Sequence, residues 1–161
     1  VRVPRNQKVI DDYVYIDVCD GSIVIPITED GNIVLLRQYK YAANDSFLVL
    51  PVGLNDKVNE TPEDVARREL QEETGYVTKK PITFLGEVFP LPNNITQKTS
   101  VYLAEGCYKS GAINLDDGEE LEAVLFPLSE LESLIFSHAI TESLSLAAIL
   151  LAGNVLKKYA R

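Results

Sequence analysis

Cysteine, histidine and tryptophan are almost missing from this 161-residue sequence, which has two cysteines, one histidine and no tryptophan. Cys19 and Cys107 could form one pair, but two cysteines do not suggest a disulfide framework, and a reducing compartment is expected. The sequence offers no second histidine and no cysteine that would bind a metal ion together with His138. We therefore expect His138 at a turn between two helices rather than in a zinc centre.

Positive charge and long apolar runs are also scarce. Acidic residues outnumber Lys and Arg by 24 to 15, and the formal net charge is -9. An acidic surface repels phosphate backbones, so nucleic acid is not an expected partner; the excess acid fits either a cation site or an ordinary solvated surface. The longest apolar stretch, residues 144–152, is too short to span a bilayer, and we find no signal peptide. These absences predict a soluble, cytoplasmic protein without a membrane partner.

The length and the 46% apolar content fit one domain with a single core. No repeat, low-complexity segment or long linker divides the chain. We expect the domain to cover residues 1–161. Because the sequence starts at Val1 rather than at a methionine, we also expect a few residues to be missing before it.

Apolar and alternating runs predict strands, and cap residues predict helices. A hairpin turn is expected at residues 29–32. The last helix is apolar nearly all round over residues 144–151, which predicts burial on several sides, including burial against a second subunit. The mixture is α+β with a mixed or mostly antiparallel sheet. The expected strands are residues 13–18, 22–27, 32–37, 47–50, 82–89, 99–104 and 121–126, and the expected helices are residues 61–74, 129–136 (with Ser129 and Glu132 as a capping box) and 141–159.

The first expected helix has clear signals at both ends. Thr61 can cap it, Pro62 suits its first position, and Asp64 stands where a capping box places an acid. Gly75 ends it. These residues predict a helix from Thr61 to the residue before Gly75.

Three glutamates lie close together on this helix. Glu69 and Glu73 are one turn apart at the edge of the apolar stripe, and Glu72 lies on the other flank of Glu69. Like charges at this spacing repel, and a divalent cation between them would remove the repulsion. Mg²⁺ prefers carboxylate oxygens. The alternative is a solvated acidic face balanced by Arg67 and Arg68, and charge pattern alone favours that alternative.

The order of the residues favours the metal. Glu60, seven further residues and the run Arg68-Glu69-Leu70-Gln71-Glu72-Glu73-Thr74-Gly75-Tyr76 resemble the Nudix box from its first glutamate to its end. The resemblance implies an α/β/α sandwich with a mixed sheet and a loop-helix-loop motif. It implies attack of water on a diphosphate, assisted by Mg²⁺ or alternatively Mn²⁺.

The same resemblance implies roles for single residues. The metal ligands would be Glu69, Glu72 and Glu73, with Glu73 also in the catalytic set. Arg68, a further member of that set, would orient the helix together with Glu60. The resemblance to the box also implies that Gly53, Glu60 and Gly75 have structural roles. Gly53 and Glu60 enclose six residues where five are usual, so the loop between them is one residue longer than the family pattern.

Residues 34–40 and 50–53 resemble the ADP-ribose pyrophosphatase branch of this family. In that branch the backbone carbonyl at the position of Val52 joins the metal shell. Arg37 and Gln38 then become candidates for substrate binding, although ordinary hydrogen bonds at a strand end explain them equally well.

An acidic loop, residues 115–122, also resembles this branch, in which such a loop supplies the catalytic base. Glu119 is our first choice for the base and Glu120 the second, because a base on a mobile loop can move to within reach of the water. The alternative is a solvated loop before a strand. The loop 89–98 departs from the branch, since asparagines and Gln97 or Lys98 stand where a glycine and an acid are usual.

The sequence thus predicts a Nudix hydrolase that cleaves ADP-ribose to AMP and ribose 5-phosphate. One alternative is the same chemistry on another nucleotide sugar, a dinucleotide or a nucleoside triphosphate. The other is a non-catalytic Nudix module that only binds a ligand. The branch resemblance also implies a homodimer whose N-terminal strands reach the partner.

Overall fold

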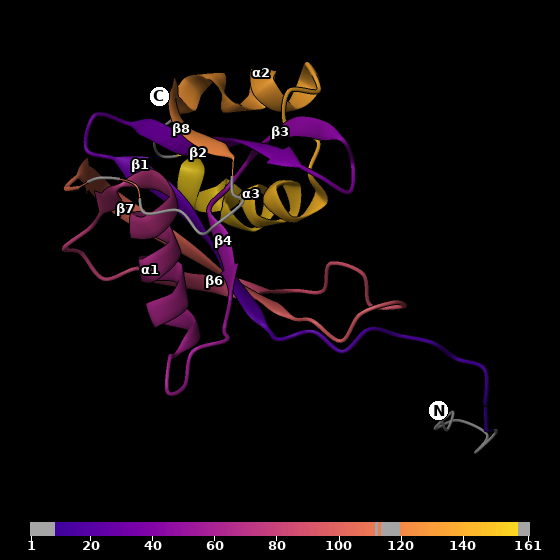
Figure 1. Cartoon of the computed structure of the whole chain (residues 1–161). Helices are drawn as coiled ribbons and strands as arrows, with labels where there is room; N and C mark the ends of the chain where they lie inside the picture. The colour runs from indigo at the N-terminus through magenta and orange to yellow at the C-terminus, as the bar shows by residue number, and fades with distance from the viewer. Residues whose placement is uncertain (1–8, 112, 114–119, 158–161) are drawn as a thin grey trace.

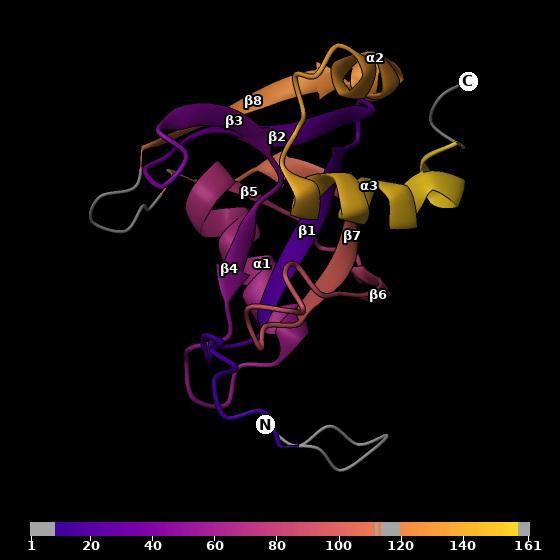
Figure 2. The same cartoon turned by 90° about the vertical axis from the view of Figure 1, so that its right-hand side faces the viewer.

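A mixed sheet with helices on both faces makes up the protein, as Figures 1 and 2 show from two sides. The computed structural model describes residues 9–111, 113 and 120–157. This architecture is the expected α/β/α sandwich, with α1 on one face and α3 on the other (Figure 2). In chain order the elements are β1 (Gly21–Thr28), β2 (Asn32–Lys40), β3 (Asp45–Val49), β4 (Val52–Leu54), α1 (Pro62–Thr74), β5 (Tyr76–Val77), β6 (Thr83–Val88), β7 (Thr99–Lys109), β8 (Leu121–Pro127), the 3-10 turn η1 (Leu128–Glu130), α2 (Leu131–Phe136) and α3 (Ser143–Leu156).

Strand β1 is the centre of the sheet. It runs parallel to β7 from the pair Gly21–Thr99 onward, and antiparallel to β4. Strand β2 follows β1 through the expected hairpin turn, in which Gly31 has φ of 78° and donates its N–H to Thr28 O. Beyond the turn, β2 pairs with β3 on one side and β8 on the other. Strand β4 therefore lies beside β1 and leads directly into the loop before α1.

Two apolar layers hold the sandwich together. Ile23 and Ile25 of β1 belong to the layer that includes Ala148 and Ile149 of α3. Val24, between them in sequence, belongs to the layer that includes Ala66 and Leu70 of α1. Successive residues of a strand point to opposite faces. The uninterrupted burial of β1 thus follows from helices on both sides.

Helix α1 confirms the prediction from its cap residues. Thr61 Oγ1 accepts a hydrogen bond from Asp64 N at 3.2 Å, and Asp64 Oδ2 accepts one from Thr61 N at 3.0 Å. The hydrogen bonds from the Thr61 side chain and backbone lower the pKa of the Asp64 carboxyl. At the other end, Gly75 has a left-handed φ of 72°.

The strand predicted for residues 13–18 is wrong. Of these residues only Ile16 forms a β-bridge, to Ile95, and Val14 is 83% exposed. Residues 9–20, which we call the N-terminal arm, run instead beside the loop 89–98 (Figure 1). Ile16 N donates to Asn94 O at 2.8 Å. Alternation predicts a strand only where a sheet lies beside the segment, and this arm has a loop beside it.

The two C-terminal helices begin differently from the prediction. Ser129 and Glu132 form no capping box, because η1 precedes α2 and the N-cap of α2 makes no side-chain hydrogen bond. His138 lies between α2 and α3, as expected, with φ of 61°. Helix α3 begins at Ser143, two residues later than predicted, because the Glu142 carboxylate accepts hydrogen bonds from the next helix N–H groups. The end predicted at residue 159 lies outside the described residues.

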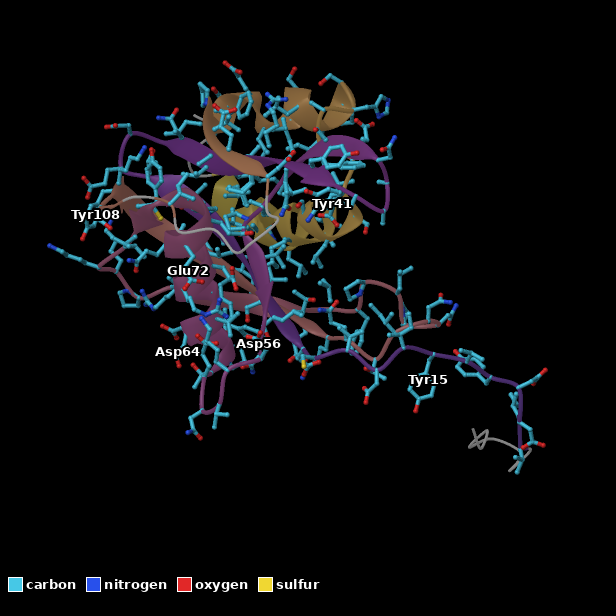
Figure 3. All side chains as sticks on the ribbon, viewed as in Figure 1. Tyr15, Tyr41, Asp56, Asp64, Glu72 and Tyr108 are labelled. Carbon is cyan, nitrogen blue, oxygen red and sulfur yellow. The ribbon has the colours of Figure 1, made fainter. Side chains whose placement is uncertain are left out.

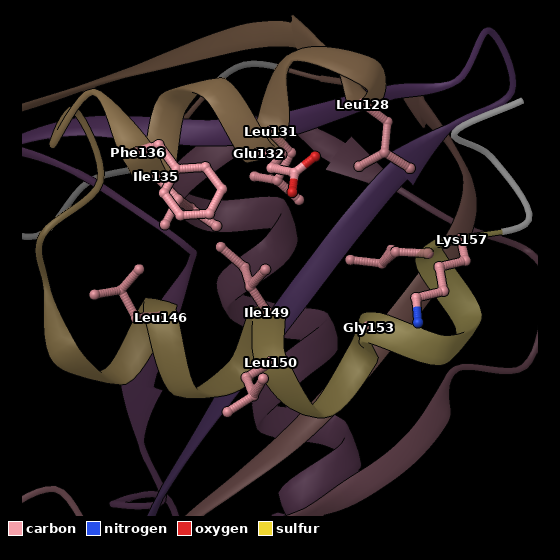
Figure 4. A pocket seen from close by; sticks show the side chains of 11 residues that line it. Leu128, Leu131, Glu132, Ile135, Phe136, Leu146, Ile149, Leu150, Gly153 and Lys157 are labelled. Carbon is pink, nitrogen blue, oxygen red and sulfur yellow. The ribbon is translucent and has the colours of Figure 1, made fainter.

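Helix α3 is buried on one face only in the single chain. Ala148 and Ala152 are fully buried, whereas Leu150 is 81% exposed. An apolar groove of about 530 Å³ separates α3 from α2 (Figure 4). Among the described helices, none is long and apolar enough to cross a membrane.

Candidate active site

The acidic residues of α1 lie where the helix meets β4. Val65, Ala66 and Leu70 form the buried face of the helix. At its first turn Ser22 Oγ of β1 donates a 2.7 Å hydrogen bond to Pro62 O. Helix α1 also contacts β4 and β8. This packing places the acids at the edge of the buried face, and Glu72 of α1, labelled in Figure 3, is partly exposed.

The guanidinium of Arg68 joins three of the carboxylates. It donates to Glu60 through Nε at 2.8 Å and through Nη1 to Glu69 at 2.5 Å and Glu72 at 3.0 Å. Its Nη2 donates to Leu54 O at 3.2 Å, which ties the helix to the end of β4. The hydrogen bonds to Glu60, and then those to Glu72 and Glu69, raise the pKa of the guanidinium above its ordinary value. The structure thus brings Arg68, Glu60, Glu69 and Glu72 together in one cluster of ion pairs.

Gly53 leaves room for one of these carboxylates. A Cβ atom at residue 53 would lie 1.8 Å from Glu69 Oε1 and 2.1 Å from its carboxyl carbon. No larger residue fits without moving Glu69. This contact is the physical reason for a glycine before the loop.

Glu73 is turned inward. The residue is only 4% exposed, and its Oε2 accepts a 3.0 Å hydrogen bond from Val52 N of β4. Burying a carboxylate is costly unless it is hydrogen-bonded or holds a cation. The position of Glu73 against Val52 joins the two elements that the sequence assigned to the metal site.

Lys57 is a site residue that the sequence analysis missed. Its Nζ lies 3.7 Å from Glu72 Oε1, and the lysine side chain is 56% exposed. The signal that could have found it is the length of the loop between Gly53 and Glu60.

The donor chemistry of this corner suits a hard divalent cation, because carboxylate oxygens dominate it. In the part of the chain that the structure describes, however, no three acidic, histidine or cysteine side chains are placed to enclose a metal ion. The reason is visible in the contacts: Arg68 and Lys57 hold Glu69 and Glu72, and Glu73 turns to Val52. A cation would require Glu72 and Glu69 to turn from these partners.

The candidate substrate residues lie on β2, which pairs with β8, and Glu120 directly precedes β8. Arg37 of β2 is exposed and pairs with Glu122, and Gln38 pairs with Leu121. Gln38 Oε1 is buried and accepts no hydrogen bond in the described structure. Glu120 is exposed, and its backbone O accepts from Tyr39 N at 3.1 Å. Glu119 lies outside the described residues.

The comparisons with known proteins agree with this geometry. The NUDIX domain family matches residues 20–145. ADP-ribose pyrophosphatase of Bacillus subtilis is 29% identical over 127 residues, which are 78% of this chain and 68% of that protein. Methanol dehydrogenase activator of Bacillus methanolicus is 31% identical over 127 residues, which are 78% of this chain and 68% of that protein. The crystal structure of an ADP compounds hydrolase superposes with a TM-score of 0.76 at 26% identity, covering 88% of this chain and 75% of the other.

Proposed function

This chain belongs to the NUDIX domain family, and on that premise we propose that it is a metal-dependent hydrolase of nucleoside diphosphates linked to another group. The proposed substrate is ADP-ribose, cleaved to AMP and ribose 5-phosphate. Support comes from the similarity to an ADP-ribose pyrophosphatase and to an ADP compounds hydrolase. The stretches 34–40 and 50–53 add to it, since they resemble the same branch.

The burial of the glutamates carries the proposal. If α1 presented only a solvated acidic face, these side chains would lie in water. Instead Glu73 is 4% exposed and the Glu69 side chain 12%. Concentrating carboxylates at one buried corner is costly for stability. A site that must hold a cation explains the arrangement, and a solvated surface does not.

Each residue of the corner then has a role. Glu69, Glu72 and Glu73, with the carbonyl of Val52, would hold Mg²⁺ or Mn²⁺. The bound ion supplies neutralisation of phosphate oxygens and a lower pKa for bound water. Arg68 orients the helix through Glu60, as its hydrogen bonds support.

Gln38 and Arg37 are the proposed substrate-binding residues, and the proposed base lies on the loop before β8. The buried Gln38 Oε1 is an acceptor with no hydrogen-bond partner in the described residues, and buried acceptors normally have one. A substrate group would supply that partner if the Gln38 side chain turned outward, and Arg37, exposed on the same strand, is the second proposed substrate residue. Glu119 or Glu120 would take the proton from the attacking water.

A screen of nucleotides with Mg²⁺ and with Mn²⁺, with the products identified, tests the proposal. The expected result is turnover of ADP-ribose to AMP and ribose 5-phosphate that a chelator stops. A Glu69→Gln, Glu73→Gln double variant is the control for a contaminating hydrolase. If the wild type binds ADP-ribose with Mg²⁺ but turns over no nucleotide in the screen, the protein is a binding module and the proposal fails.

We further propose a homodimer in the cytoplasm. The N-terminal arm supports the dimer, because Val14 is 83% and Ile16 64% exposed in the single chain; the small number of cysteines supports the compartment. Light scattering of the wild type and of a Val14→Asp, Ile16→Asp variant tests the dimer. A monomeric wild type would contradict it.

A further inference from the structure

The loop between β4 and α1 is tied to the body of the protein near its start, and a hydrogen bond within the loop closes a turn near its end. Asn55 N donates to Asp20 O at 2.8 Å, and Glu60 N donates to Lys57 O at 3.4 Å, which closes a turn over residues 57–60. Asn59 has φ of 66°, a left-handed conformation that asparagine adopts more readily than most residues. The backbone of Lys57 is therefore held in place although its side chain is exposed.

Both carboxylate oxygens of Glu72 face a cationic side chain in this arrangement. Oε2 accepts from Arg68 Nη1 at 3.0 Å, and Oε1 lies 3.7 Å from Lys57 Nζ. The two cations are not equivalent. Arg68 is 17% exposed and has further partners in Glu60 and Glu69, whereas Lys57 is 56% exposed and pairs at a longer distance.

Glu72 is also the most accessible of the three carboxylates on Arg68. Its side chain is 33% exposed, against 13% for Glu60 and 12% for Glu69. An ion pair between two solvent-exposed side chains contributes little to stability and is readily exchanged. The Lys57–Glu72 pair is thus the weakest of the ion pairs in the cluster and the one that a competing cation reaches first.

On the basis of the proposed metal-dependent function, we propose that Lys57 is a positioning residue that holds Glu72 in the metal-free protein and releases it when a divalent cation binds. An ammonium group and a divalent cation compete for the same carboxylate oxygen and repel each other at close range. Lys57 therefore lowers the affinity of the site for metal. The turn at residues 57–60 is the feature that sets this competition.

Titration with Mn²⁺ alone, followed by electron paramagnetic resonance, tests this competition without any turnover. Lys57→Gln should bind Mn²⁺ about two- to fivefold more tightly than the wild type, the range expected for loss of an exposed ion pair. Lys109→Gln is the matched control, because it removes the same charge from an exposed lysine on β7. It measures the general effect of making the net charge one unit more negative.

Two further measurements separate competition from a structural effect. Lys57→Arg retains the charge and should keep the Kd for Mn²⁺ within about twofold of the wild type. The difference between Lys57→Gln and Lys109→Gln should narrow in about 0.5 M salt, since salt screens exposed charges. A structural loosening of the loop would not depend on salt in this way.

The outcomes distinguish this inference from the proposed function. If Lys57→Gln has the same Kd as Lys109→Gln, or binds Mn²⁺ more weakly than the wild type, the role of Lys57 is wrong and the metal site stands. If the wild type binds no Mn²⁺, or binds it no more tightly than the Glu69→Gln, Glu73→Gln double variant, the assignment of the metal site is wrong. The role proposed for Lys57 is then wrong as well.

Discussion

The Glu69 carboxylate occupies the space that a Cβ atom of residue 53 would need. An added Cβ would lie 1.8 Å from Glu69 Oε1. The two residues come from different elements, since Gly53 is in β4 and Glu69 is in α1. The Glu69 carboxylate can lie against β4 in this position only because residue 53 has no side chain.

Gly53→Ala should therefore displace Glu69 and weaken metal binding. We expect a loss of at least about tenfold in Mn²⁺ affinity, as for other changes that move a ligand, and a loss of about 1–3 kcal/mol in the free energy of unfolding from overpacking. Gly111→Ala is the control, because an added Cβ there meets nothing within 4 Å. Wild-type Mn²⁺ affinity in Gly53→Ala would show that the glycine does not serve the site.

Glu73→Gln should abolish turnover and leave the fold intact. The glutamine amide oxygen can still accept the hydrogen bond from Val52 N that Glu73 Oε2 accepts at 3.0 Å, but a neutral amide is a poor ligand for Mg²⁺. We expect kcat to fall by more than about 100-fold, with a Tm within a few degrees of the wild type. Near-native kcat in saturating Mg²⁺ would remove Glu73 from the metal site.

Metal should stabilise the folded protein. A ligand at about 100 times its Kd that binds only the folded state adds about 2.7 kcal/mol, which for a chain of this size raises the Tm by roughly 5–10 °C. Thermal melts with Mg²⁺ and with a chelator at equal ionic strength measure this shift. The Glu69→Gln, Glu73→Gln double variant should lose it, and an equal shift in that variant would indicate metal bound elsewhere.

The base is expected on the loop before β8. Glu119→Gln should lower kcat by roughly the 10²–10⁴-fold that general bases contribute, with little change in Mn²⁺ affinity, because the α1 glutamates remain. Glu120→Gln is the paired variant. A loss in Glu120→Gln alone would move the assignment by one residue, and full activity in both would place the base outside this loop.

The two thiols should react at very different rates. Cys107 is 2% exposed, and burial raises the pKa of its thiol to about 12, whereas Cys19 is exposed. Because the thiolate is the reactive form, we expect one thiol per native chain to react with an alkylating reagent at pH 8, and two after denaturation. Rapid modification of both in the native state would contradict the burial of Cys107.

The same shift gives a pH dependence of stability. The pKa of Cys107 is higher in the folded state than the ordinary value of about 8.5 in the unfolded chain. Its contribution is therefore fully present below about pH 8.5 and is lost as the pH rises toward 12. Urea unfolding at pH 8 and pH 10 should show a smaller decline in Cys107→Ala than in the wild type.

Helix α1 was predictable because its signals are local. Thr61, Asp64 and Gly75 act within one turn of the helix ends, so no distant part of the chain could change the outcome. The spacing of the acids likewise predicted that Glu69 and Glu73 lie at the edge of the buried face, and both side chains are largely buried. Both predictions rest on residues close together in sequence.

Features that depend on distant contacts were not predictable. The N-terminal arm alternates like a strand, yet its hydrogen bonds go to a loop about 80 residues away. Lys57 meets Glu72 only because the turn at residues 57–60 directs it there. The pattern of Ser129 and Glu132 suited a cap, but the 3-10 turn before α2 removed the geometry that a cap needs.

The parallel pairing of β1 with β7 has a consequence for how the protein folds. This pairing joins residue 21 to residue 99, and the whole stretch from Gly53 to Gly75 lies inside the chain segment that it encloses. Contacts so far apart in sequence form slowly, because a long loop must close first. Closure of this loop should therefore limit the rate of refolding, and we expect the acidic corner, which packs on β1 through α1 and β4, to be complete only after that step. Mn²⁺ bound to the native protein should then slow its unfolding, whereas Mn²⁺ added to the unfolded chain should leave the rate of refolding nearly unchanged.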